Sequence, residues 1–167
     1  MKVLVTGATG YVGGRLVPEL LQAGHEVRVL VRDPRRVEGR PWLADAEVVA
    51  ADLGDRVALG AAARGVEAAY YLIHSMAAGA GYAARDRALA TAFADALQTV
   101  DRVIYLGGLL PEHPSEHLRS RAEVGRILRE RLPTTEFRAG PIIGSGSDMN
   151  ASWMRDCANT AQVLKRP

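Results

Sequence analysis

The stretch VLVTGATGYVGG, residues 3–14, decides the fold of this chain. A short apolar, largely β-branched run leads directly into glycines with the spacing G-x-x-G-x-x-G, and a helical pattern of apolar residues follows from Tyr11 to Ala23. The period of that pattern is typical of an amphipathic helix, and Gly24 ends it. The stretch therefore predicts a strand, a tight glycine turn and a helix in immediate succession.

The glycine turn has the chemistry of a phosphate-binding loop. Gly7 permits a tight turn, Gly10 lets the backbone approach a pyrophosphate, and Gly13 lets the helix pack closely on the strand. The start of the helix adds unpaired N–H groups and a partial positive charge, which favour phosphate. A plain glycine turn is the alternative, but the order of strand, turn and helix favours binding. The residues predicted to hold a dinucleotide here are Gly7, Ala8, Thr9, Gly10, Tyr11, Val12 and Gly13.

The rest of the chain repeats the alternation of strand and helix. Apolar, β-branched stretches predict strands at 2–6, 26–31, 46–50, 67–73, 102–106 and 134–139. Helical spacing predicts helices at 11–23, 52–65 and 115–132, and a long helix whose apolar stripe runs from Ala88 to Val100. Near-continuous apolar strands indicate that helices cover both faces of the sheet. Repeated β-α units predict an α/β fold with a doubly wound parallel sheet, the NAD(P)-binding Rossmann fold.

The composition is that of one folded, soluble domain. The chain has 167 residues, 48% of them hydrophobic and 24% charged, which excludes a disordered chain. The formal net charge is +2 and no polybasic tract occurs, so we expect neither nucleic acid nor an anionic membrane as a partner. No apolar run is long enough for a membrane span, and the N-terminal one is too short for a signal-peptide core. We therefore expect a cytoplasmic protein.

The end of the second predicted strand discriminates between the two dinucleotides. Binders of NAD place an acid there for the ribose hydroxyls, whereas binders of NADP place an arginine nearby for the 2′-phosphate. Arg32 follows the strand directly and suits the 2′-phosphate and the adenine face. Asp33 comes next and could accept a ribose hydroxyl instead, and a solvated cluster of loop charges is a further alternative. The sequence favours NADP(H) as the cofactor and leaves NAD(H) open.

These features resemble the short-chain dehydrogenase/reductase superfamily in its atypical branch. The block VTGATGYVGGRLVPELLQAGHEVRVLVRDP, residues 5–34, is typical of the superfamily. Later blocks resemble NmrA-like and nucleoside-diphosphate-sugar-epimerase-like NAD(P)-binding proteins, including bacterial ones with an appended DUF2867-type region; these blocks are YYLIHSM at 70–76, IYLGGL at 104–109, HLRSRAEVGRILR at 117–129 and RAGPIIGSGS at 138–147.

The likeness covers residues 1–147, which implies an NAD(P)-binding domain over that range. Residues 148–167 are then an atypical C-terminal tail, with a short helix expected to end at Leu164. Relatives normally continue into a substrate-binding region. By the resemblance, the C-terminal substrate lobe is expected to be largely missing.

The resemblance also implies site residues at the carboxyl ends of the strands, where ligands of such sheets bind. Asp52 and Leu53 would border the adenine, and Ile73 and His74 would line the side of the nicotinamide ribose. Gly107 would lie near the nicotinamide. The helices after the fourth and fifth strands commonly pair between subunits in this superfamily, so the resemblance also implies a homodimer.

The catalytic residues of the superfamily are absent from this sequence. Active members use a tyrosine four residues before a lysine, which lowers the pKa of the tyrosine, and a serine after the fifth strand. The only lysines here are Lys2 and Lys165, and no Tyr-x-x-x-Lys occurs. By the resemblance, His117 and Arg121 take the places of tyrosine and lysine, and a glycine pair takes that of the serine. His117 could act as an acid or base, or it could be a solvent-facing histidine near a helix start.

No metal site is predicted. His113 and His117 are four residues apart, but Pro114 between them opposes a shared helical face, and zinc needs three or four ligands. Cys157 is the single cysteine, so no internal disulfide can form, and we expect it to be inert.

Three functions stay open. The first is an NADP(H)-binding oxidoreductase or epimerase-like protein acting on a small molecule, which is the usual activity of the superfamily. The second is a non-catalytic dinucleotide-binding or redox-sensing regulator, which the missing tyrosine, lysine and serine favour. The third is a truncated domain without activity of its own.

Overall fold

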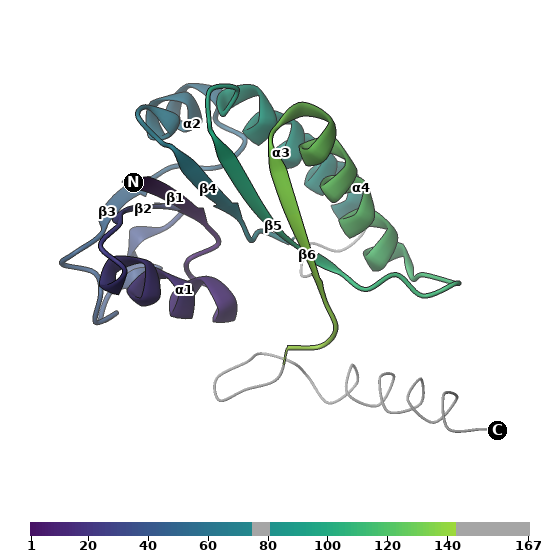
Figure 1. Cartoon of the computed structure of the whole chain (residues 1–167), viewed down its shortest axis with the longest axis horizontal. Helices are drawn as coiled ribbons and strands as arrows, with labels where there is room; N and C mark the ends of the chain where they lie inside the picture. Colours follow the sequence, from purple (N-terminus) through teal and green to yellow (C-terminus); the bar gives the residue numbers. More distant parts are fainter. Residues whose placement is uncertain (75–80, 143–167) are drawn as a thin grey trace.

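Residues 1–74 and 81–142 are described by the computed structural model, which has a Rossmann-like α/β fold. Six parallel strands form one sheet in the order β3-β2-β1-β4-β5-β6, which confirms the predicted doubly wound sheet (Figure 1). The strands are β1 (Lys2–Thr6), β2 (Glu26–Val31), β3 (Glu47–Ala50), β4 (Ala68–Tyr71), β5 (Arg102–Gly108) and β6 (Thr134–Ala139). The helices are α1 (Tyr11–Gln22), α2 (Arg56–Ala63), α3 (Tyr82–Ala96), α4 (Glu116–Arg131) and the short 3₁₀ helix η1 (Pro34–Val37).

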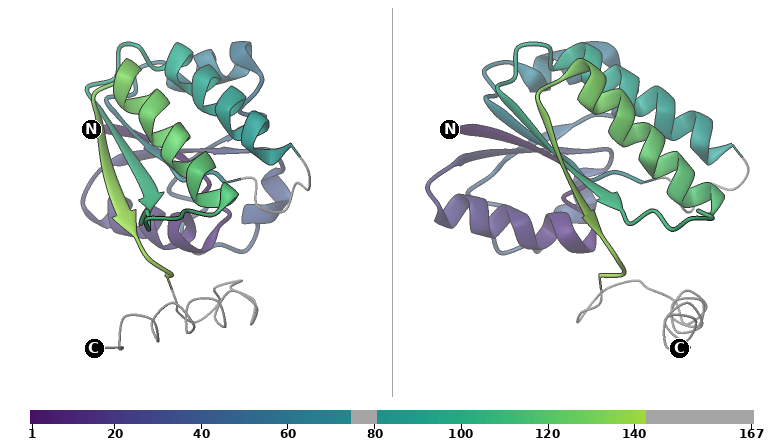
Figure 2. Two further views of the ribbon diagram at one scale, coloured as in Figure 1. Left: turned by 90° about the vertical axis from the view of Figure 1, so that its right-hand side faces the viewer. Right: turned by 45° about the vertical axis from the view of Figure 1, so that its right-hand side comes forward.

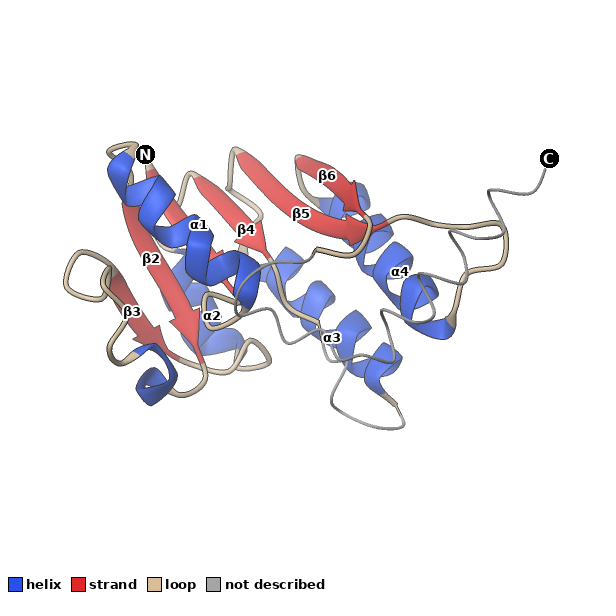
Figure 3. Ribbon diagram, turned by 90° about the horizontal axis from the view of Figure 1, so that it is seen from below, coloured by secondary structure: helices blue, strands red, loops and turns tan. Residues whose placement is uncertain are grey.

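The helices form unequal layers on the two faces of the sheet. Helix α1 lies on one face, whereas α2, α3 and α4 lie together on the other (Figures 2 and 3). The sheet grows outward from β1 to β3, and the chain then crosses to β4 on the other side of β1. Right-handed crossovers in that reversed direction place the later helices on the opposite face.

Each face has its own hydrophobic core. The larger core lies between the sheet and α2–α4, where Phe93, Tyr105 and Leu128 are fully buried. The smaller core lies between β1–β3 and α1, where Val5 and Val17 are fully buried. Trp42 completes the smaller core, and its indole N–H donates to the Gly14 carbonyl of α1 at 3.3 Å. The two cores fix the position of α1 and of the glycine turn that precedes it.

Several predicted boundaries move because short polar side chains bind the backbone. Helix α2 begins at Arg56 rather than at residue 52, because Asp52 accepts from the Gly54 N–H at 2.8 Å and Asp55 caps the helix. The apolar stripe predicted to end at Val100 extends past α3, whose last residue is Ala96. The short helix predicted to end at Leu164, and Cys157, lie outside the described residues.

Helices lie on both faces of the sheet, as predicted, but among the described residues α1 reaches only part of its face (Figures 2 and 3). On the α1 side, apolar residues of β4, β5 and β6 border a groove of about 550 Å³ beside α1, here called the open groove. Its strand residues include Tyr70, Ile104, Leu106 and Phe137, and Leu72, which follows β4, also lines it. The side chain of Phe137 is 59% exposed. The helices that follow β3, β4 and β5 pack on the opposite face, so among the described residues α1 is the one α-helix on this side of the sheet (Figure 3).

Candidate functional site

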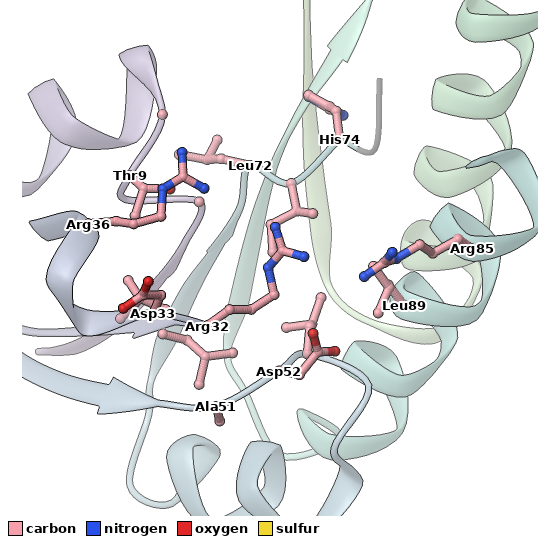
Figure 4. Close-up of a pocket in the computed structure, with 16 residues that line it drawn as sticks. Thr9, Arg32, Asp33, Arg36, Ala51, Asp52, Leu72, His74, Arg85 and Leu89 are labelled. Carbon is pink, nitrogen blue, oxygen red and sulfur yellow. The ribbon is translucent and has the colours of Figure 1, made fainter. Parts of the chain in front are cut away.

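A cavity of about 570 Å³ lies at the carboxyl ends of β1–β4, where the strand order reverses (Figure 4). Ligands of doubly wound sheets bind at this switch point. The structure brings nine of the predicted cofactor residues together along this cavity: Gly7, Thr9, Gly10, Arg32, Asp33, Asp52, Leu53, Ile73 and His74.

The glycine turn forms the floor of the cavity through its backbone. Gly7 has φ +80°, and a Cβ there would lie 2.8 Å from the Leu72 carbonyl oxygen, so both the turn and the neighbouring strand require glycine. The Gly10 N–H donates to the Gly7 carbonyl at 3.0 Å and closes the turn. The Thr6 hydroxyl donates to the Tyr70 carbonyl at 3.0 Å and so ties the ends of β1 and β4 together.

Helix α1 begins directly at this turn, and no side chain caps its first N–H groups. Those amides are left for a ligand or for water, and the helix dipole favours an anion there. Ala8, Tyr11, Val12 and Gly13 do not line the cavity themselves. Ala8 is fully buried, and Gly13 lies against the backbone of Gly7.

The charged side chains at the end of β2 differ in whether another residue already binds them. Asp33 caps η1 and accepts from the Arg35 backbone N–H at 3.1 Å and from its guanidinium at 2.9 Å. The hydrogen bond from the Arg35 side chain holds the pKa of Asp33 below its usual value. Arg32 and Arg36 also line the cavity, and their side chains have no hydrogen bond or ion pair within the described part of the chain.

The opposite wall holds residues that the sequence analysis missed. Arg85 and Leu89 of α3 line the cavity across from Thr9 and Arg36 (Figure 4). Leu53 and Leu89 give this wall an apolar part that suits a base. A signal was present in the sequence, because extending the predicted stripe of α3 back by one turn from Leu89 reaches Arg85.

The residues compared with the catalytic tyrosine and lysine lie outside this cavity, on α4. The Arg121 guanidinium donates to the Leu106 carbonyl of β5 at 2.8 Å, and the Arg121 carbonyl accepts from the Tyr105 hydroxyl at 2.8 Å. Burial lowers the pKa of Arg121. The His117 ring is half-buried, with its centroid 6.4 Å from that of Tyr82. Burial, and secondarily the charge of Arg121, lowers the pKa of His117.

The glycine pair at the end of β5 is filled by packing rather than open to a ligand. A Cβ at Gly108 would lie 2.9 Å from the Leu118 side chain and 3.6 Å from Nε of Arg121. A Cβ at Gly107 would lie 3.2 Å from the carboxyl carbon of Glu136. Gly107 therefore packs against β6 and does not line the cavity. Leu118 and Arg121 already occupy the space into which a serine side chain at Gly108 would extend.

Burial shifts the pKa values of other groups near the ends of β4 and β5. Burial lowers the pKa of His74 to about 3 and raises that of Tyr105 to about 12. Asp86 of α3 is buried and accepts from the Ser120 hydroxyl at 3.3 Å. Its charge adds to burial in raising the pKa of Tyr71. In contrast to the superfamily tyrosine, neither Tyr71 nor Tyr105 has a lowered pKa.

Within residues 1–74 and 81–142, no group of three or more His, Cys, Asp and Glu side chains could hold a metal ion. None of the helices in this range combines the length and the apolar character that a membrane crossing requires.

Comparisons with known proteins place these features in a family. The model of the NmrA-like family matches residues 1–131. A curated relative, the (4-alkanoyl-5-oxo-2,5-dihydrofuran-3-yl)methyl phosphate reductase of Streptomyces griseus, is 47% identical over 68 residues, which are 41% of this chain and 23% of the relative. The chain thus matches less than a quarter of the length of that relative.

Solved structures share the fold. An NADPH-dependent quinone oxidoreductase from Escherichia coli, solved with NADPH, is 25% identical with a TM-score of 0.67, over 81% of this chain and 48% of that one. A short-chain dehydrogenase/reductase superfamily protein from Agrobacterium tumefaciens, solved with NAD, is 22% identical with a TM-score of 0.68, over 83% of this chain and 48% of that one. The chain spans about half the length of these structures.

Proposed function

This chain belongs to the NmrA-like family, within the superfamily of NAD(P)-binding Rossmann oxidoreductases and epimerases, and from that premise we propose that its cavity binds NADP(H) in preference to NAD(H). We further propose that residues 1–147 form the binding unit and that the protein is an oxidoreductase or epimerase-like protein acting on a small molecule.

The observation that carries the cofactor preference is the difference between the arginines and the aspartate at the end of β2. Arg32 and Arg36 line the cavity with guanidinium groups that form no hydrogen bond or ion pair with a described residue, although the charge of Arg36 acts on Asp33 nearby. A 2′-phosphate offers such groups charge-assisted, bidentate hydrogen bonds. Asp33, the residue that would favour NAD, already accepts three hydrogen bonds from Arg35. An acid engaged in this way is a poor partner for ribose hydroxyls.

The remaining cavity residues suit the other parts of the dinucleotide. The amides at the start of α1 would hold the pyrophosphate, and Leu53 with Leu89 would contact the adenine. Ile73 and His74 would border the nicotinamide ribose. When bound, the nicotinamide supplies hydride transfer, and the chain would hold and orient it. A homodimer through α3 and α4 stays part of the proposal, since these helices form an outer layer (Figure 2).

The test is a pair of calorimetric titrations with NADPH and NADH. We expect wild-type protein to bind NADPH more tightly. The Arg32→Ala variant should lose about ten- to hundredfold in affinity for NADPH, the range for charge-assisted hydrogen bonds, with NADH nearly unaffected. Equal binding of the two cofactors by the wild type would contradict the preference, and binding of neither would contradict the proposal as a whole.

A non-catalytic dinucleotide-binding regulator is the second candidate, and the geometry around Arg121 favours it. Its guanidinium is turned to the Leu106 carbonyl, and Leu118 lies where a serine at Gly108 would extend. The group in the place of the lysine is thus engaged in holding α4 on β5. His117 is then the one proposed acid or base near this end of the sheet.

Turnover distinguishes the two candidates. Oxidation of NADPH is measured against a panel of carbonyl compounds, with wild type and His117→Ala. If His117 donates a proton in an oxidoreductase, the rate should fall at least about tenfold in the variant. General acid catalysis typically contributes about a hundredfold or more. Tight NADPH binding without turnover would support the regulator. Turnover that the substitution leaves unchanged would remove His117 from the mechanism.

A further inference from the structure

Three arginine side chains that form no hydrogen bond or ion pair with the described residues line the cavity. Most arginines of the described part of the chain are bound, as Arg28 is to Glu47, Arg87 to Glu123 and Arg126 to Glu130. By contrast, the guanidinium groups of Arg32, Arg36 and Arg85 form no hydrogen bond or ion pair with described residues, and all three line the cavity. The guanidinium groups of Arg40, Arg64 and Arg102 also form none, but these residues lie outside the cavity. Like charges that share one cavity repel each other, so the arrangement favours a ligand with several negative charges.

Arg85 enters the cavity from a different wall than the other two. Figure 4 shows its side chain extending from α3 on the side opposite Thr9 and Arg36, toward the same space as the Arg32 guanidinium. The rotation of α3 is fixed by the next residue, because Asp86 is buried and bound to Ser120 of α4. Leu89, one turn further along, also lines the cavity. The helix therefore holds Arg85 on the cavity side.

We propose that Arg85 is a second phosphate-binding group, which binds the pyrophosphate of the dinucleotide from the wall opposite the glycine turn. This inference rests on the function proposed above. The uncapped amides at the start of α1 would bind a pyrophosphate from the side of the glycine turn, and Arg85 would add a cationic partner from the opposite wall. A guanidinium matches two phosphate oxygens at once.

The carboxylates that face this region do not take the place of the phosphate. Asp33 is bound to Arg35 at the far end of the cavity. Asp52 also lines the cavity (Figure 4); its Oδ1 accepts from the Gly54 N–H at 2.8 Å, and it forms no ion pair with Arg32 or Arg85. Arg32 and Arg36 are left to the 2′-phosphate, so the two ends of the ligand are read by different residues.

The experiment separates the two phosphate positions by choice of ligand. Wild type, Arg85→Gln and Arg32→Gln are titrated at one fixed ionic strength with NADPH, NADH, ADP-ribose and adenosine 2′-monophosphate. ADP-ribose has the pyrophosphate alone, and adenosine 2′-monophosphate has the 2′-phosphate alone. Arg85→Gln should weaken NADPH, NADH and ADP-ribose by the same factor, about ten- to hundredfold, and leave adenosine 2′-monophosphate unchanged. Arg32→Gln should weaken NADPH and adenosine 2′-monophosphate and leave NADH and ADP-ribose unchanged.

Controls cover folding and general charge. Arg64→Gln removes an exposed arginine outside the cavity and should leave every affinity unchanged. Arg85→Lys should restore part of the affinity, since it keeps the charge without the bidentate geometry. All variants should melt at the temperature of the wild type, because the Arg85 side chain is exposed and forms no hydrogen bond or ion pair with a described residue.

Two results would overturn the inference: unchanged affinities in Arg85→Gln, or a loss confined to NADPH and adenosine 2′-monophosphate. If the wild type binds none of the four ligands, the dinucleotide proposal fails by itself. A titration with inorganic pyrophosphate then tests the role of Arg85 separately. If the wild type binds pyrophosphate and Arg85→Gln does not, the phosphate site at Arg85 is supported. If the wild type does not bind pyrophosphate, that site is rejected as well.

Discussion

On the α1 side, the two halves of the sheet differ in how completely they are built. Helix α1 and the side chain of Trp42 cover strands β1–β3, whose residues Val5 and Val29 are fully buried. Strands β4–β6 border the open groove, and Phe137 is 59% exposed. The cavity lies at the ends of β1–β4, whereas His117 and Arg121 lie beside β5.

The difference separates cofactor binding from catalysis. On the proposed function, binding would depend on backbone amides and arginines, most of which come from residues 7–36, with Arg85 added from α3. Catalysis would need side chains of β5 and α4, and the groups there are engaged in packing or have pKa values that burial shifts. The proposed cofactor cavity is thus lined by residues that suit its ligand, while the neighbouring part of the sheet has a histidine and an arginine in place of the usual tyrosine and lysine and, among the described residues, borders an open groove.

The largest expected effect tests the two faces of β4–β6 with the two phenylalanines of the chain. Phe93 is fully buried between the sheet and α3, so Phe93→Ala should lower the free energy of unfolding by about 3–5 kcal/mol. Phe137 faces the open groove, so Phe137→Ala should change it by less than about 0.5 kcal/mol. Urea denaturation followed by circular dichroism measures both.

The Phe137 result bears directly on the open groove. If Phe137→Ala cost about 2 kcal/mol or more, the side chain would be buried in solution, and a further segment or a second copy of the chain would have to cover the groove. Repeating the measurement at several protein concentrations separates these cases, since only burial between copies makes stability depend on concentration.

Much of the fold could be predicted from the sequence, because periodicity and glycine spacing report local geometry. All six strands lie where their apolar runs predict them. The open groove was missed for a topological reason: apolar residues such as Ile104 and Leu106 predict a buried strand, but not which element covers it. Helix α1 packs on one half of that face, whereas the described helices α2, α3 and α4 pack on the other face (Figure 3).

The candidate site divides in the same way. The residues of the glycine turn and the ends of β2–β4 follow from their position in the sequence, and nine of them line one cavity. Arg85 was missed because it comes from a helix whose rotation depends on the burial of Asp86. The engagement of Asp33 by Arg35 was missed because it depends on a side-chain conformation within η1.

A smaller effect tests the closed half through the glycine that seats α1 on the turn. Gly13→Ala places a Cβ that overlaps the Gly7 carbonyl oxygen and lies 2.8 Å from its carbonyl carbon. Both atoms belong to backbone that the turn and the smaller core hold in place. We expect a loss of about 1–3 kcal/mol in the free energy of unfolding, the usual range for overpacking, together with weaker NADPH binding.

Gly60→Ala is the matched control, because the same added methyl group meets nothing within 4 Å in the interior of α2. Alanine there should raise stability by about 0.5–1 kcal/mol, since glycine is the poorer helix former. The two substitutions therefore move stability in opposite directions, and only Gly13→Ala should affect cofactor affinity. A Gly13→Ala protein as stable as wild type would mean that α1 can move away from the turn. The closed half would then be no more rigidly packed than the open one, and the cavity would lack the fixed floor on which the phosphate-binding proposals depend.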